Sequence, residues 1–272
     1  MARDEEALAR DIRAFEAVAV PYLLSLLDSA EFRVRRFAGR VLSAMDGLTE
    51  KDLDALVAAR DRGDEEISLA IANVGSTRAI QVLVEDLRRR PGAMTSLKYA
   101  LARVPHRAAG PLARLFDSPT PVSDELADAV CWIFDWVKDD AAPAVDVLVA
   151  RASDREAPLK NRVLAIRALG CMGLTARGAV LKLKTIAATA PDDVGAAINA
   201  AMVAIGAPEA VPLHVAALRQ HPNVVVLRDI AEMRENVHDA GPAVTAVLAS
   251  PNRELRVAAA RTLGFIGYRS RP

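Results

Sequence analysis

The stretch Val34–Leu42, with the sequence VRRFAGRVL, recurs twice further along the chain. The second copy is Asn161–Leu169, NRVLAIRAL, and the third is Leu255–Leu263, LRVAAARTL. All three share an Arg, an Ala three positions later, an Arg five positions later and a Leu seven positions later. Internal copies of this kind are the signature of a repeat architecture.

The alanine at the centre of this stretch marks a helix that recurs along the whole chain. An apolar residue follows each marker after four and after seven positions, as Leu42 and Met45 follow Ala38, which is the spacing of one helix face. The intervals range from 28 to 35 residues, with a mean of about 32. The markers are Ala38, Ile67, Leu97, Val130, Ala165, Ile198, Val226 and Ala259.

A second amphipathic run precedes each marked helix, so every repeat is expected to be a helix–turn–helix hairpin. Proline at Pro21, Pro111, Pro143, Pro212 and Pro242 predicts the start of first helices, where its missing N–H is tolerated. Glycine at Gly75, Gly173, Gly206 and Gly267 predicts the end of second helices.

The combined pattern, Pro-x-Leu-x-x-Leu-Leu followed by Val-Arg-x-x-Ala-x-x-Ala-Leu-x-x-Leu-Gly, resembles the bacterial HEAT repeat, of the short HEAT-like or PBS-lyase type. The resemblance covers roughly residues 18–267, although the Arg pair is absent from five of the eight units. It implies an all-α protein, a right-handed α-solenoid of about eight HEAT-type hairpins spanning residues 1–272 as one domain. We expect a cap helix at 1–17 and repeats at about 18–47, 48–76, 77–105, 106–138, 139–174, 175–206, 207–238 and 239–268.

Composition restricts the classes of partner. The 35 basic and 35 acidic residues balance, so no global charge draws the chain to nucleic acid or to an anionic membrane. No apolar run is long enough for a membrane span, and the charged N-terminus is unlike a secretory signal. We therefore expect a cytoplasmic protein, favour a monomer, and expect Cys131 and Cys171 to be packed inside helices.

The family resemblance also suggests a binding surface, because second helices line the concave face of HEAT solenoids. Residues two positions after each marker lie about 200° round the helix from it, away from the first helices. This column holds an apolar and aromatic centre flanked by arginines, and Trp, Tyr and Arg dominate interaction hot spots. The alternative is that Trp132 and Tyr99 pack against neighbouring repeats. Its members are Arg40, Leu69, Tyr99, Trp132, Arg167, Ala200, Arg228 and Arg261.

The fourth unit carries a further feature, a helical stripe of tryptophans and carboxylates: Asp128, Trp132, Asp135, Trp136 and Asp139. Such a stripe suits a cationic patch or an arginine of a partner. A solvated acidic face, with Trp136 partly buried at its flank, is the alternative.

Other arginines favour structural roles. Arg35, Arg162 and Arg256 lie at the helix flank, where the family resemblance implies an Asp–Arg ladder between repeats.

Signals for catalysis are missing from the sequence. The histidines have no metal-ligand spacing, and the His-Glu motifs with which HEAT-like deoxyhypusine hydroxylases hold iron do not occur. No phosphate-binding Gly loop or Gly-x-Ser-x-Gly elbow occurs either. We expect no enzyme activity, no metal and no cofactor.

The predicted function is a non-catalytic protein–protein interaction scaffold, or a regulatory or inhibitory protein, that binds a protein partner. Three alternatives stay open. The first is nucleic-acid binding of the HEAT-like DNA glycosylase kind, for which the neutral charge is unfavourable. The others are an accessory bilin-lyase-type protein and a toxin-immunity protein that meets a basic cleft with Asp128, Asp135 and Asp139. The arginines available for nucleic acid are Arg36, Arg40, Arg162, Arg167, Arg256 and Arg261.

Overall fold

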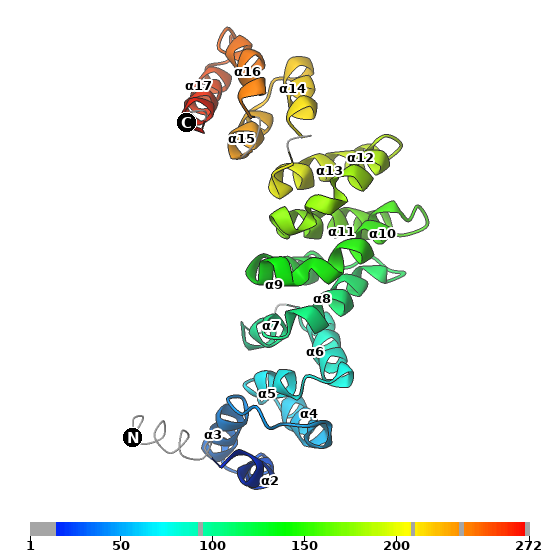
Figure 1. The fold of residues 1–272 in the computed structure, drawn as a ribbon, viewed down its shortest axis with the longest axis vertical. Coiled ribbons are helices and arrows are strands. Elements are labelled where there is room, and N and C mark those ends of the chain that lie inside the picture. The colour runs from blue at the N-terminus through cyan, green and yellow to red at the C-terminus, as the bar shows by residue number, and fades with distance from the viewer. Residues whose placement is uncertain (1–14, 92–94, 208–209, 234–236, 270–272) are drawn as a thin grey trace. The chain divides into compact units, whose positions relative to one another are not determined.

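The computed structural model describes residues 15–91, 95–207, 210–233 and 237–269. Over these residues it is all-α, with helices joined by turns and short 3₁₀ segments and no strand (Figure 1). The predicted all-α class and the predicted eight helix hairpins are confirmed. Most of the predicted cap, 1–17, lies outside the described residues.

Contacts divide the chain into two compact units, and each is described by itself. Unit 1 comprises residues 1–115 and 123–140, and unit 2 comprises 116–122 and 141–272. The continuity of the two units as one solenoid, the right-handed coil and the repeat boundaries stay predictions.

Unit 1 contains four hairpins in which each second helix packs on the next, α3 on α5, α5 on α7 and α7 on α9. Among the first helices, α6 packs on α8. The four hairpins are α2 (Glu16–Leu26) with α3 (Phe32–Leu42), α4 (Leu53–Asp61) with α5 (Ile67–Val74), α6 (Thr77–Arg89) with α7 (Thr95–Ala102), and α8 (Pro105–Arg114) with α9 (Asp124–Val137).

Unit 2 repeats the same order of contacts, with α11 on α13, α13 on α15 and α15 on α17. First helices also meet, α10 with α12 and α14 with α16. Its hairpins are α10 (Val145–Ser153) with α11 (Leu159–Cys171), α12 (Val180–Ala187) with α13 (Asp192–Ile205), α14 (Ala210–Gln220) with α15 (Val224–Glu232), and α16 (Gly241–Val247) with α17 (Arg253–Arg269).

The core follows the marker column derived from the sequence. Seven of the eight markers are buried, and Val226 is half-buried. Of the residues four positions after a marker, seven are also buried, and Leu263 is half-buried. One hairpin cannot cover this stripe alone, so its burial against the neighbouring hairpin supplies the hydrophobic stabilisation of each stack.

The helix ends follow the predictions from proline and glycine less closely than the core follows the marker column. Gly75, Gly173 and Gly206 adopt the predicted left-handed conformation, with φ of 63°, 58° and 73°. Gly267 was expected to close the last helix, but α17 runs past it to Arg269. Pro21 lies inside α2, because that helix begins five residues earlier, at Glu16.

Pro111 similarly lies inside α8, which begins at Pro105. Pro242 does lie in the first turn of α16, as predicted.

Side-chain amides tie each of two hairpins to the loop before it. Asn73 Nδ2 donates to the Ser43 and Met45 carbonyls at 3.0 and 2.9 Å. Asn161 Nδ2 donates to the Ser118 and Thr120 carbonyls at 2.9 and 3.0 Å. These bonds satisfy backbone groups that the turns leave unpaired, so they fix the loops between repeats.

A buried ion pair links the second hairpin to the third. Arg60 is 3% exposed, its Nε donates to Ser68 Oγ at 2.8 Å, and its guanidinium pairs with Asp86 on α6. Burial, and secondarily the charge of Arg90, lowers the pKa of Arg60 to about 10. Arg60 is therefore charged at neutral pH and depends on Asp86 as its counter-charge.

We predict that Asp86→Ala lowers the free energy of unfolding by about 3–5 kcal/mol, because it leaves the Arg60 charge buried without its counter-ion. Asp54→Ala removes one of the two exposed acidic partners of Arg78, the other being Glu50, and should cost about 0–1 kcal/mol. Urea unfolding followed by circular dichroism compares the two variants. An equally small loss in both would contradict the role assigned to the Arg60–Asp86 pair.

Candidate functional site

The predicted column lies on the solvent-facing side of the second helices in each unit. In unit 1, Arg40 and Tyr99 are exposed, and Leu69 and Trp132 are half-buried. In unit 2 every member of the column is exposed: Arg167, Ala200, Arg228 and Arg261. Because successive second helices pack on one another within a unit, the column members of that unit lie on adjacent helices.

Three aromatic rings form a surface cluster on α7 and α9. Tyr99 lies edge-on to Trp132 and to Trp136, with ring centroids 5.2 and 5.4 Å apart. The two indoles stack at 5.4 Å with an interplanar angle of 18°. Tyr99 is 37% exposed and Trp136 is 59% exposed. We call these three residues the aromatic cluster.

Local helix geometry brings two of the three rings together, and packing between hairpins adds the third. Trp132 and Trp136 are four residues apart on α9, which places them one above the other on one helix face. Tyr99 reaches them from α7, which packs directly against α9. The sequence placed Trp136 on the stripe, or in the alternative partly buried at its flank, and neither reading included its contact with Tyr99.

Carboxylates surround the aromatic cluster, but the predicted acidic stripe is shorter than expected. Asp128 and Asp135 are exposed on α9, and Asp135 forms an ion pair with Lys138. Asp139 lies beyond α9, because Lys138 takes a φ of 50° and ends the helix. Asp139 was expected on the helical stripe, and the structure corrects this.

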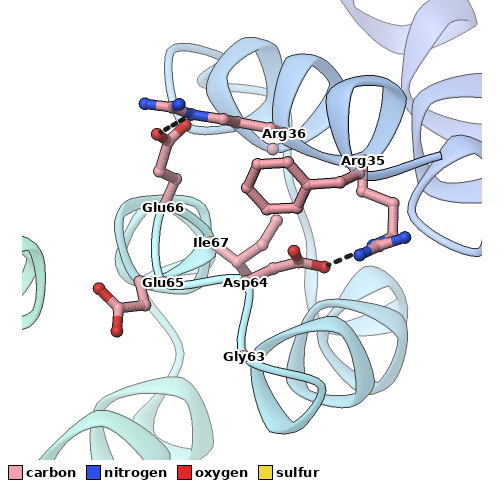
Figure 2. A pocket seen from close by; sticks show the side chains of 9 residues that line it. Arg35, Arg36, Gly63, Asp64, Glu65, Glu66 and Ile67 are labelled. Atoms are coloured by element: carbon pink, nitrogen blue, oxygen red, sulfur yellow. Dashed lines mark hydrogen bonds and ion pairs between the residues drawn. The ribbon is translucent and has the colours of Figure 1, made fainter.

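Figure 2 shows a separate pocket of about 220 Å³ between α3 and the turn before α5. Arg35 Nε lies 3.5 Å from Asp64, whose side chain is 9% exposed, and Arg36 Nε lies 2.8 Å from Glu66. Arg35 also donates to the Ser29 and Ala30 carbonyls at 2.9 and 3.1 Å. The inter-repeat Asp–Arg ladder predicted for Arg35 is confirmed.

The other two ladder arginines make different contacts. Arg256 Nη1 donates to the Ser250 and Pro251 carbonyls, both at 2.9 Å, the same bonds that Arg35 makes to its own turn. Arg162 Nε donates to the Ala152 carbonyl at 3.1 Å. Among the described residues neither has a recorded Asp partner, so the ladder prediction was wrong for Arg162 and Arg256.

No group of three or more His, Cys, Asp and Glu residues within the described ranges is placed to hold a metal ion. Three of the four histidines each contact one carboxylate, at separate places: His106 with Asp140 at 3.2 Å, His214 with Asp229 at 3.7 Å and His238 with Asp239 at 3.1 Å. None of the described helices is long and apolar enough to cross a membrane.

Comparisons with known proteins give similar helical structures but no family. No family model and no curated protein matches the chain. An engineered protein matches with a TM-score of 0.35 and 18% identity, over 97% of this chain and 95% of that one. Human deoxyhypusine hydroxylase, solved in complex with glycerol, matches with a TM-score of 0.35 and 16% identity, over 92% and 96%.

The complex of CpcE and CpcF of phycocyanin lyase from Nostoc sp. PCC7120 matches with a TM-score of 0.34 and 14% identity, over 92% and 94%. At these scores and identities the matches say nothing about activity or partner. The chain is a helical-repeat protein by its own eight hairpins.

We predict that Trp136→Ala costs only about 0.5–1.5 kcal/mol of unfolding free energy, because the exposed ring loses mainly its aromatic contacts. Phe134→Ala, in the same helix but fully buried, should cost about 3–5 kcal/mol. The near-ultraviolet circular dichroism of the stacked indoles should also fall in the Trp136 variant. Equal losses of stability would show that Trp136 is a core residue, contrary to its position here.

Proposed function

We propose that the chain is a non-catalytic scaffold that holds a protein partner on the second helices of unit 1. The observation that supports this proposal is the aromatic cluster, with its exposed Tyr99 and Trp136. Exposing an indole to water is unfavourable, whereas covering it with a partner removes apolar area from water at little entropic cost. Residues of these types dominate the binding energy of protein interfaces.

The partner we propose is a segment that combines basic and apolar side chains. An arginine stacks well on an indole face, and the exposed polar side of α9 is mainly acidic. Lys138 pairs with Asp135 and His106 contacts Asp140, so a basic partner would share these two carboxylates with them. The exposed acidic side chains of α9 and the segment after it are Asp124, Glu125, Asp128, Asp135, Asp139 and Asp140.

The same surroundings disfavour nucleic acid at the aromatic cluster. Aromatic platforms that stack bases are set in positively charged grooves that follow the phosphate backbone. Here the exposed charged side chains of α9 are acidic, so the helix that carries the two indoles offers no such positive groove. A protein partner therefore suits this surface better than a single strand.

We predict that Trp132→Ala/Trp136→Ala abolishes partner capture from the native lysate while leaving helicity intact. Tyr22→Ala is the matched control, because Tyr22 is a 66% exposed aromatic residue of α2 in the same unit. A photo-crosslinker at position 136, but not at position 22, should label the captured partner. Capture of the same partner by wild type and the double variant alike would refute this site.

A further inference from the structure

A second pocket, of about 470 Å³, lies in unit 2 where the hairpin α10–α11 meets the hairpin α12–α13. It lies at the turns of the two hairpins and is separate from the aromatic cluster in both sequence and chemistry. None of the described residues that line it is a carboxylate. The polar and charged lining consists of Ser153, Arg155, Arg162, Thr185 and Thr189, with Pro191 at the start of α13.

Arg162 is the buried cation of this pocket. It is 6% exposed, and its Nε donates to the Ala152 carbonyl. A guanidinium carries five N–H donors in a planar fork, so this bond leaves the Nη groups for another acceptor. A buried charge is costly unless an opposite charge pairs with it.

Arg155 and Thr189 bring a second cation and a hydroxyl to the same place. Arg155 Nη2 donates to Thr189 Oγ1 at 3.0 Å, which joins the two hairpins. Thr189 accepts in that bond, so its own hydroxyl hydrogen remains available to a ligand. The hydroxyls of Ser153 and Thr185 instead donate to the helix carbonyls of Ala150 and Leu181.

The start of α13 adds little net positive potential. Pro191 is the N-cap of this 14-residue helix and provides no side-chain cap, but the first turn carries Asp192 and Asp193. These carboxylates offset the positive end of the helix dipole. The pocket's positive charge therefore comes from its two arginines, with Thr189 as a hydroxyl donor.

The pocket in Figure 2 can be compared with this one, because each is lined by an arginine of the repeated sequence. Arg35 and Arg162 occupy the same place in the repeat, three residues before their markers. Arg35 is met by Asp64, which lies three residues before the next marker, whereas the residue three before the marker that follows Arg162 is Gly195. The arginine is present in both repeats, but the aspartate at this sequence position is present only in the first.

Glu66, the partner of Arg36, lies one residue before its marker, and the residue at that position in the later repeat is Ala197. The nearby Asp154 is engaged by Arg151 Nη1 at 2.9 Å. The described residues that line the pocket thus place no carboxylate beside Arg162.

We propose that this pocket binds a phosphate-type oxyanion, either inorganic phosphate or a small phosphomonoester. Planar guanidinium forks match the oxygens of phosphate in paired, charge-assisted hydrogen bonds. A volume of about 470 Å³ lies within the range of about 300–1,000 Å³ that is typical of small-molecule sites. This leaves room for the organic group of a phosphomonoester.

Titration calorimetry on the full chain at low salt, with inorganic phosphate and separately with glycerol 3-phosphate, tests this proposal. We expect saturable binding of at least one of the two, weakened about tenfold or more by Arg155→Gln, which removes a charge-assisted hydrogen bond. Arg219→Gln removes the same charge from an exposed residue of α14 outside the pocket and should leave the affinity within about twofold. Tighter binding of the ester would identify the ligand as a phosphorylated small molecule, and equal binding would identify free phosphate.

Three results would overturn the proposal. One is the absence of binding of both anions at about 10 mM, which is far weaker than a charged pocket of this kind should bind. The second is an equal loss of affinity in Arg155→Gln and Arg219→Gln, which would indicate general surface charge. The third is binding confined to a single-stranded oligonucleotide, which would assign the arginines to nucleic acid instead.

Discussion

Close packing of each second helix on the next is the constraint on which both units depend. The backbones approach where small residues allow it. A Cβ at Gly170 would lie 3.2 Å from the Cα of Ala201, and a Cβ at Gly39 would lie 3.3 Å from Ile67. This approach buries the marker column on one side of each second helix and leaves the residues two positions later on the other side, in water. The packed column thus determines which residues are available to a partner.

Polar contacts then distinguish one repeat from another on the same scaffold. Where a carboxylate of the next hairpin meets the arginine, as Asp64 meets Arg35, the pair belongs to the fold. Where that carboxylate is absent, as beside Arg162, the same arginine lines a pocket without neutralising charge. The aromatic cluster in unit 1 follows the same logic, since Tyr99 and Trp132 occupy column positions that arginine holds in other repeats. Each proposed site is a local departure from the repeat, and the repeat itself supplies the framework.

The sequence predicts the repeated architecture well because burial at a period of about 32 residues is a property of the whole chain. Markers, their apolar followers and the outward column all follow from helix geometry, and the structure places them accordingly. Helix ends are harder to predict, because helix propensity is a weak signal that the tertiary context overrides. Thus α2 begins five residues before Pro21, and α17 continues two residues past Gly267. The stripe ends early for a separate reason, the positive φ of 50° at Lys138.

Sites built from two hairpins were the least predictable. The spacing of Trp132 and Trp136 indicates a shared face, but the contact with Tyr99 depends on the packing of α7 against α9. Arg155 and Thr189 are 34 residues apart, and nothing in their local sequence indicates the bond between them. The acidic run at Asp64–Glu66, one period after Arg35 and Arg36, is the signal from which that pocket could have been predicted.

The stability of matched glycine variants tests the packing constraint most directly. Gly170 and Gly195 are both inside second helices, but no atom lies within 4 Å of a Cβ placed on Gly195. Glutamine favours helix over glycine by about 0.5–1 kcal/mol, so Gly195→Gln should unfold at the same or a higher urea concentration than wild type. Gly170→Gln should lose about 1–3 kcal/mol, because its side chain forces α11 away from α13. If the two variants were equally stable, close packing of second helices would not be what holds the stack together.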